Sequence, residues 1–121
     1  MIGYAYVATT ILLTVYGQLI VKWRVDEAGA FPGSLSGKLE FLARLMIDPW
    51  VISVFAGAAI AALAWMAALT RFELSRAYPF VALSFVLVLL LSALIFGEAL
   101  TWPKILGVVL IVVGLAVGSQ T

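Results

Sequence analysis

Four runs of apolar residues, joined by short polar connections, make up most of this chain. They extend over about residues 2–22, 49–70, 76–96 and 102–119, with each boundary placed to within about two to four residues. A helix crosses the hydrocarbon core of a bilayer with about 20 predominantly apolar residues, and each run has close to that length. The runs therefore predict an all-α integral membrane protein, a single domain over residues 1–121 built as a bundle of four transmembrane helices.

The composition excludes an ordinary soluble domain. Hydrophobic residues account for 65% of the 121 residues and charged residues for only 11%, and the mean hydropathy is +1.21. Soluble domains carry about 25% charged residues. Nearly all charged residues lie between the apolar runs, so no segment remains for a soluble catalytic domain. We expect any activity to lie among the helices and their connections, and we do not expect a soluble enzyme.

Several residue types that carry chemistry are missing. The chain has no cysteine and no histidine, which excludes disulfides, thiol catalysis and haem attachment and argues against a metal site. The sequence contains no glycine-rich phosphate loop and no nucleophile elbow. A net charge of +1 points to no nucleic-acid partner. We predict no catalytic residue, no metal and no cofactor.

The sequence also predicts helix boundaries and one further, shorter helix. Asp48-Pro49 places an N-cap side chain before a proline at the first helical position, and residues 101–103 repeat this arrangement with a one-residue offset. After a chain break at residues 31–34, apolar residues recur at helical spacing over about residues 35–47, with charged residues between them. This pattern predicts a short amphipathic helix at the membrane interface, between the first and second spans.

A polar stripe follows the first apolar run, at Tyr6, Thr10, Thr14, Gln18 and Lys22. A step of four residues returns to nearly the same helix face and drifts by about 40°, so these side chains form one slowly turning ridge. Polar groups at membrane depth face a protein interior or a wet cavity, not lipid. The stripe contains no acid. It predicts a hydrogen-bonding wall that ends in a cation.

The fourth run carries glycines that favour pairing between chains. Gly107, Gly114 and Gly118 give the run a smooth face on which two helix backbones approach closely. Four helices leave little room for a polar cavity, so we expect a homodimer or a heterodimer with a related four-helix chain. The alternative is tight packing within one bundle. The second run is rich in small residues over 56–64, which we expect to pack inside the bundle.

Lysine and arginine indicate an orientation in the membrane. Arg71 and Arg76 lie on the side that the second connection shares with both termini, and five such residues lie on the other side. Because cytoplasmic loops are enriched in these residues, we predict both termini outside the cytoplasm. The alternative is that Lys22, Arg71 and Arg76 serve a function and do not indicate the orientation. The five residues are Lys22, Arg24, Lys38, Arg44 and Lys104.

Four segments together carry a resemblance to a known superfamily. They are Ile11–Leu19 followed by Lys22, then Leu74–Pro79, then Phe96–Leu100, then Gly107 with Gly114. In order and spacing, over essentially the whole chain, they resemble the four-helix proteins of the drug/metabolite transporter superfamily, with its EamA and small multidrug resistance-like members. The resemblance implies a small multidrug resistance-like fold in the bacterial inner membrane.

Two groups within that superfamily are distinguished by the first span. The small multidrug resistance exporters have a proton-exchanging glutamate there, and the matching residue here is Thr14, whose hydroxyl does not titrate near neutral pH. The small flippase subunits that resemble the aminoarabinose-phosphoundecaprenol translocase pair are more similar, in Gly17–Leu19 with Lys22 and in Ala77–Pro79. This resemblance implies a flippase, or a flippase subunit, that moves a polyprenyl-phosphate-linked sugar by alternating access.

Such a substrate has a hydroxyl-rich head, an anionic phosphate and a long apolar tail that stays in membrane lipid. We expect hydroxyl, amide and aromatic side chains at the head, and the cations at the phosphate, where arginine offers a planar fork and lysine a compact charge. The expected contacts are Thr14, Gln18, Lys22, Trp65, Arg76 and Tyr78.

Other interpretations of these residues and of the chain stay open. The alternative role of Thr14 is a hydrogen bond from its hydroxyl to a helix carbonyl. The alternative role of Lys22 and Arg76 is to extend their charged ends to the lipid headgroups. Tyr78 anchors the helix at the interface, and Trp65 fills the bundle. The alternative functions are a proton-coupled exporter of small cations or drugs, and a non-transporting accessory subunit of an envelope glycan pathway.

Overall fold

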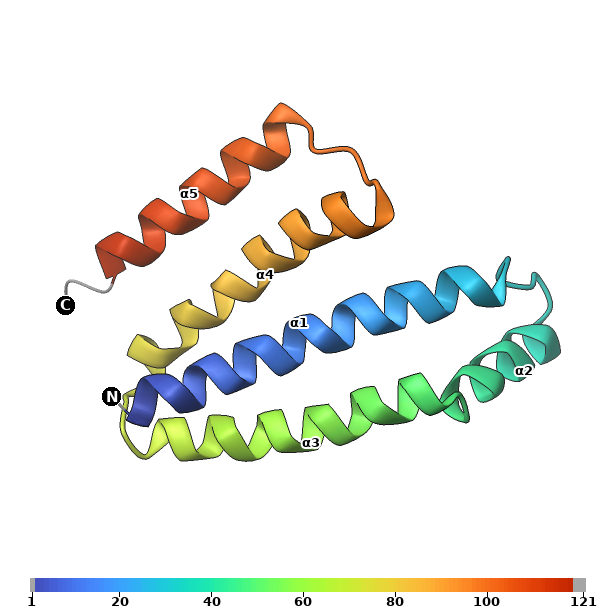
Figure 1. The fold of residues 1–121 in the computed structure, drawn as a ribbon, viewed down its shortest axis with the longest axis horizontal. Coiled ribbons are helices and arrows are strands. Elements are labelled where there is room, and N and C mark those ends of the chain that lie inside the picture. The colour runs from blue at the N-terminus through green and yellow to red at the C-terminus, as the bar shows by residue number, and fades with distance from the viewer. Residues whose placement is uncertain (1, 119–121) are drawn as a thin grey trace.

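The structure is a computed structural model and describes residues 2–118, all of whose regular elements are α-helices. Each of the four apolar runs forms a helix, and the segment expected to be amphipathic forms one more, so the all-helical architecture is confirmed. Residue 119, the last of the fourth run, lies outside the described residues. The helices are α1 (Ile2–Ala28), α2 (Leu35–Met46), α3 (Pro49–Leu69), α4 (Leu74–Phe96) and α5 (Trp102–Gly118) (Figure 1).

The helix ends follow the local sequence signals. The Asp48 carboxylate accepts a hydrogen bond from the Trp50 N–H at 2.9 Å, and Pro49 opens α3. Ser34 caps α2 in the same way, through the Gly37 N–H at 3.1 Å. At the end of α4, Gly97 has φ +67°, a left-handed conformation that glycine adopts without steric cost. The start signals at Asp48 and at residues 101–103 are therefore confirmed.

The long helices alternate in direction along the chain (Figure 1). α1 and α3 lie side by side and antiparallel and form the most extensive helix pair, with α4 against the other side of α1. Gly17 allows a close approach, because a Cβ there would lie 3.1 Å from Val54 Cγ1. Among the described residues, α5 contacts α4 alone. The N-terminal end of α1, the α3–α4 connection and the C-terminal end of α5 share one end of the molecule (Figure 1).

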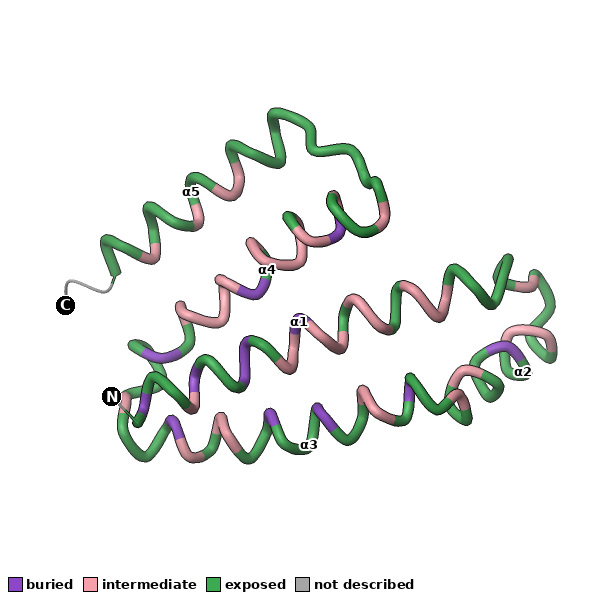
Figure 2. Tube along the Cα trace, viewed as in Figure 1, coloured by how far each residue is buried: buried purple, intermediate pink, exposed green. Residues whose placement is uncertain are grey.

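The core lies between α1, α3 and the first part of α4. Val7, Ile11 and Val15 of α1 are buried together with Ala68 of α3, and aromatic and leucine side chains of α4 pack against them. The purple, buried segments of Figure 2 fall mainly on α1 and α3, and α5 contains no buried residue. The packing is therefore strongest at α1 and falls off toward α5.

The outer faces of the helices are apolar, as a bilayer requires. α1, α3 and α4 are each long and apolar enough to cross a membrane. α5 is apolar but has 17 residues. Large hydrophobic side chains such as Leu12, Leu63 and Leu94 are exposed on these helices. In water such a surface favours aggregation, whereas in lipid it is the expected outer face. The chain is a helical, multi-pass membrane protein.

An ion pair ties the end of α1 to the start of α3. The Arg24 Nη2 lies 2.8 Å from Asp48 Oδ2, and its Nε donates to the same oxygen at 2.9 Å. Burial raises the pKa of Asp48, but hydrogen bonds from the Trp50 N–H and Arg24, with the positive charge of Arg24, outweigh burial and lower that pKa below its ordinary value. The charged form of Asp48 therefore stabilises the folded state.

We predict that Asp48→Asn lowers the midpoint of thermal unfolding in detergent at neutral pH, since asparagine keeps the N-cap but loses the charge. A carboxyl with a depressed folded-state pKa contributes stability above its unfolded value of about 3.9 and loses it as pH falls through the folded value. Variant and wild type therefore converge in strong acid. Asp26→Asn, which breaks the exposed Lys22–Asp26 pair, serves as control with little effect. Equal effects of both substitutions at neutral pH would contradict this account.

Candidate functional site

A cavity of about 530 Å³ lies between α1, α3 and α4. Its α1 wall runs from Thr10 to Val21, about 17 Å along the helix at 1.5 Å per residue. Its size is within the range of about 300–1,000 Å³ that is usual for small-ligand sites. Four of the six expected contact residues line it: Thr14, Gln18, Trp65 and Tyr78.

Small residues on α3 make the space for this cavity. Ala58, Ala61 and Ala62 face the polar wall of α1 across it. These alanines belong to the small-residue run that we expected to pack inside the bundle. Gly57 and Ala61 are indeed buried, so this surface both packs against α1 and lines the cavity. The lining role was missed, although small side chains opposite a polar ridge were the available signal.

The polar stripe of α1 passes from the core into the cavity. The Thr10 hydroxyl donates to the Tyr6 carbonyl at 3.0 Å and lies 3.3 Å from the Ala61 carbonyl of α3. The Thr14 hydroxyl donates to the Thr10 carbonyl at 2.7 Å. This is the carbonyl bonding we named as the alternative for Thr14, and it leaves that oxygen only as an acceptor. Thr10 is a lining residue that was not among the expected contacts.

Gln18 has a different environment from the threonines. Its side chain lines the cavity, and within residues 2–118 it forms no hydrogen bond. An amide carries both donors and acceptors, and at this depth the membrane itself supplies neither. Gln18 therefore presents a complete hydrogen-bonding group to whatever fills the cavity.

An aromatic pair lines the α3–α4 side of the cavity. The rings of Trp65 and Tyr78 lie 6.3 Å apart between centroids, inclined at 73° in an edge-to-face arrangement. Trp65 is half-buried and Tyr78 is exposed. Neither the indole N–H nor the phenol O–H has a hydrogen-bond partner within the described part of the chain. The two side chains come from different helices, so their contact was not readable from sequence spacing.

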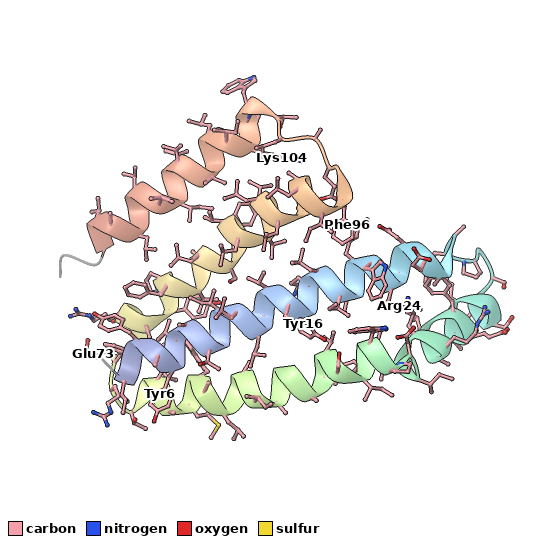
Figure 3. The ribbon with its side chains drawn as sticks, viewed as in Figure 1. Tyr6, Tyr16, Arg24, Glu73, Phe96 and Lys104 are labelled. Carbon is pink, nitrogen blue, oxygen red and sulfur yellow. The ribbon has the colours of Figure 1, made fainter. Side chains whose placement is uncertain are left out.

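The two expected cations lie outside this cavity and far from each other. Lys22 forms an ion pair with Asp26 at 3.2 Å, one turn further along α1. Arg76 lies near the opposite end of α1, in the first turn of α4. There the ring centroids of Tyr4 and Phe72, which precedes α4, are 4.9 Å apart. Tyr4 and Lys22 are separated by about 27 Å along α1. In Figure 3, the label Glu73 lies at the Arg76 end of the molecule and the label Arg24 lies at the Lys22 end.

Arg76 lines a second cavity at the end of the molecule near the termini. This cavity has a volume of about 790 Å³ and also contains Arg71, Glu73 and Ser75. Within residues 2–118, neither arginine forms an ion pair. The structure therefore does not bring Lys22 and Arg76 together, and it places Arg71 beside Arg76 instead.

The glycines of α5 face open space. A Cβ added at Gly107, Gly114 or Gly118 would meet nothing within 4 Å. Tight packing within one bundle, which was the alternative to pairing between chains, therefore does not explain them in the described part of the chain. A dimer interface at these glycines remains a prediction.

Comparison with known proteins gives a consistent picture. The EamA-like transporter family matches residues 1–119. The "probable 4-amino-4-deoxy-L-arabinose-phosphoundecaprenol flippase subunit ArnF" of Aeromonas salmonicida is 38% identical over 114 residues, covering 93% of this chain and 75% of the relative. The subunit of the same name from Serratia proteamaculans is 31% identical, with 93% and 88% covered. The corresponding subunit ArnE of Pseudomonas aeruginosa is 32% identical, with 93% and 92% covered. No solved structure matches the chain.

The absence of cysteine allows a direct test of the cavity. We predict that Gln18→Cys in intact membranes reacts with a charged, membrane-impermeant thiol reagent about tenfold faster or more than Leu12→Cys. Leu12 is 63% exposed and lies outside the cavity lining, so we expect it to face lipid. Only a thiol in water ionises and reacts. Equally slow labelling at both positions would mean that the cavity is dry or closed.

Proposed function

The chain belongs to the EamA-like transporter family, and we propose that it is a flippase, or a subunit of a flippase, for a polyprenyl-phosphate-linked sugar. Members of this family are transporters and not enzymes. The names of the similar flippase subunits support a lipid-linked sugar as the substrate.

This proposal depends above all on the cavity between α1, α3 and α4, whose mostly apolar lining contains several polar side chains. Thr14, Gln18, Trp65 and Tyr78 line one space between three helices. A sugar needs hydrogen-bonding partners to leave water, and its C–H faces pack well on aromatic rings. The α1 wall covers about 17 Å of a hydrocarbon core about 30 Å thick. The sugar therefore crosses more than half of the core beside protein while its tail remains in lipid.

The two cationic ends give this movement a phosphate contact at each membrane surface. Arg76, with Arg71 beside it, lies at one end, and Lys22 lies at the other. An arginine pair binds phosphate through planar forks, and lysine acts as a point charge. In our proposal, alternating access passes the phosphate from one end to the other, and each cation serves at a different stage.

Helix lengths support the span count that we propose. α5, with 17 residues, is about 26 Å long and is the fourth span, with a small mismatch that local bilayer thinning absorbs. We propose that α2 lies in the interface, because its exposed Leu35, Leu39 and Leu42 suit the acyl boundary. We propose the bacterial inner membrane as the location, with both termini outside the cytoplasm.

The functional unit is proposed to be a dimer, of two identical chains or of this chain with a related four-helix chain. α5 is the outermost helix and its glycine face is open. Small residues let membrane helices approach closely and gain van der Waals contact. A second chain on this face also covers the side of the bundle where, among the described residues, α5 packs only against α4.

The substrate is tested by binding to the purified protein. We predict that Gln18→Ala weakens binding of a polyprenyl-phosphate sugar by about tenfold, the effect of losing hydrogen bonds worth 1–2 kcal/mol. Arg76→Ala weakens it through loss of a charged contact. The matched control is Thr9→Ala, since Thr9 is an exposed α1 hydroxyl that bonds to the Ala5 carbonyl and does not line the cavity. Unchanged binding in both test variants would refute the assignment.

The dimer is tested separately by native mass spectrometry from mild detergent. We predict that Gly114→Leu reduces the dimer by about tenfold relative to the monomer, because a large side chain holds the paired helices apart. The chain's own fold tolerates this change, since a Cβ at Gly114 meets no neighbour. Val113→Leu, at an exposed position beside it, is the control. An undiminished dimer in Gly114→Leu would place the interface elsewhere.

A further inference from the structure

A second space on α1 shares no residue with the cavity described above. It is an apolar groove of about 350 Å³ between the later part of α1 and the end of α4. Figure 3 shows Tyr16 and Phe96 on these two facing helices. Ile95 and Phe96 are the last two residues of α4, so the groove lies where that helix ends. None of its lining residues is charged: they are Tyr16, Leu19, Ile20, Trp23, Ile95 and Phe96.

Two aromatic walls of this apolar groove are held in place by their own contacts. The Ser53 hydroxyl donates to the Trp50 carbonyl at 2.5 Å, so it accepts the hydrogen bond that joins it to the Tyr16 hydroxyl at 2.7 Å. The rings of Trp23 and Trp50 lie edge to face, with centroids 5.4 Å apart, and the Arg24 guanidinium lies 4.8 Å from the Trp23 ring. The groove therefore offers fixed ring surfaces and branched aliphatic side chains, which suit an apolar chain.

Lys22 lies between the cavity and the apolar groove. At about 100° per residue, Lys22 is about 40° beyond Gln18 around α1. In the same sense, Leu19 and Trp23 follow at about 60° and 100° beyond Lys22. The Lys22–Asp26 ion pair is half-exposed, and pairs of this kind contribute little, so a phosphate replaces Asp26 at small cost. A phosphate at Lys22 thus has the cavity on one side and the groove on the other.

The groove also runs in the direction that a lipid tail takes. Lys22 ends the apolar run at residues 2–22, near one membrane surface. From Trp23 to Tyr16 the groove extends about 10 Å along α1, toward the middle of the span. A chain attached to a phosphate at that surface must run the same way. A sugar in the cavity and a tail in the groove therefore lie on two sides of α1, with the phosphate between them.

The apolar character of the groove does not by itself distinguish one lipid chain from another, because lipid tails are as apolar as its side chains. Stiffness and shape do distinguish them. An isoprenoid chain has a double bond that does not rotate in every unit, so it loses less conformational freedom than a saturated chain when it is ordered. Its methyl branches also gain van der Waals contact with side chains such as Leu19 and Ile95.

We propose that the apolar groove holds the first part of the polyprenyl chain of the transported lipid while its phosphate is at Lys22, and that the groove prefers an isoprenoid to a saturated chain. The rest of the chain stays in lipid. This inference rests on the proposed function and adds recognition of the tail to it.

The test uses two lipids with the same 4-amino-4-deoxy-L-arabinose phosphate. One carries it on undecaprenol, the lipid in the names of the relatives, and the other on a saturated, unbranched alcohol with the same number of carbons. They compete for the purified full-length protein in phospholipid nanodiscs. The undecaprenyl lipid is expected to bind at least about threefold more tightly. Equal or weaker binding of this lipid overturns the inference and leaves the flippase proposal intact, whereas binding of neither lipid overturns both.

Variants at the end of α4 test the location. Ile95→Trp fills the groove from a residue that is 60% exposed, and it is expected to abolish the preference. Leu94→Trp adds the same side chain at the neighbouring residue, which is 81% exposed and outside the lining, and it is expected to keep the preference. Phe96→Ala removes one wall and is an independent variant with the same expected loss as Ile95→Trp. A preference kept in Ile95→Trp and Phe96→Ala, or lost equally in Leu94→Trp, overturns the assignment to this groove.

Discussion

A polar ridge on a membrane-spanning helix must face something other than lipid, and the rest of this structure follows from how α1 meets that constraint. Thr10 is buried against α3, where it lies 3.3 Å from the Ala61 carbonyl. The Thr14 hydroxyl donates its hydrogen bond to the Thr10 carbonyl of the same helix. The Gln18 side chain has no such hydrogen bond within the described residues, and it lines the cavity. Since the apolar membrane offers no partner to these groups, α3 and α4 must surround α1, and the most extensive packing lies there.

Much of the fold was predictable because it depends on local patterns. Helix positions follow from apolar run length, and helix starts follow from residues such as Asp48 and Pro49. The end of α1 was not predictable from hydropathy. α1 continues beyond Lys22 to Ala28, where the Lys22–Asp26 pair lies one turn apart and Arg24 reaches Asp48 of the next helix. Charged residues ended the apolar run without ending the helix.

The candidate site was predictable in its parts but not in its assembly. The ridge identified Thr14 and Gln18, because helical spacing places them on one face. Trp65 and Tyr78 belong to separate helices, and only the packing of α3 with α4 brings their rings together. Lys22 and Arg76 were assigned to one phosphate, yet they lie at opposite ends. Consecutive long helices alternate in direction, so a residue late in α1 and a residue early in α4 are far apart.

We propose that the polar face of α1 carries a lipid-linked sugar headgroup through the membrane. The most direct measurement is the rate at which a polyprenyl-phosphate sugar crosses the bilayer of vesicles containing the purified protein with any partner chain that copurifies. We predict a rate at least about tenfold above that of protein-free vesicles. We also predict that Ala62→Trp, which fills the cavity from an exposed lining position, returns the rate to background. A wild-type rate equal to that of protein-free vesicles would contradict the claim.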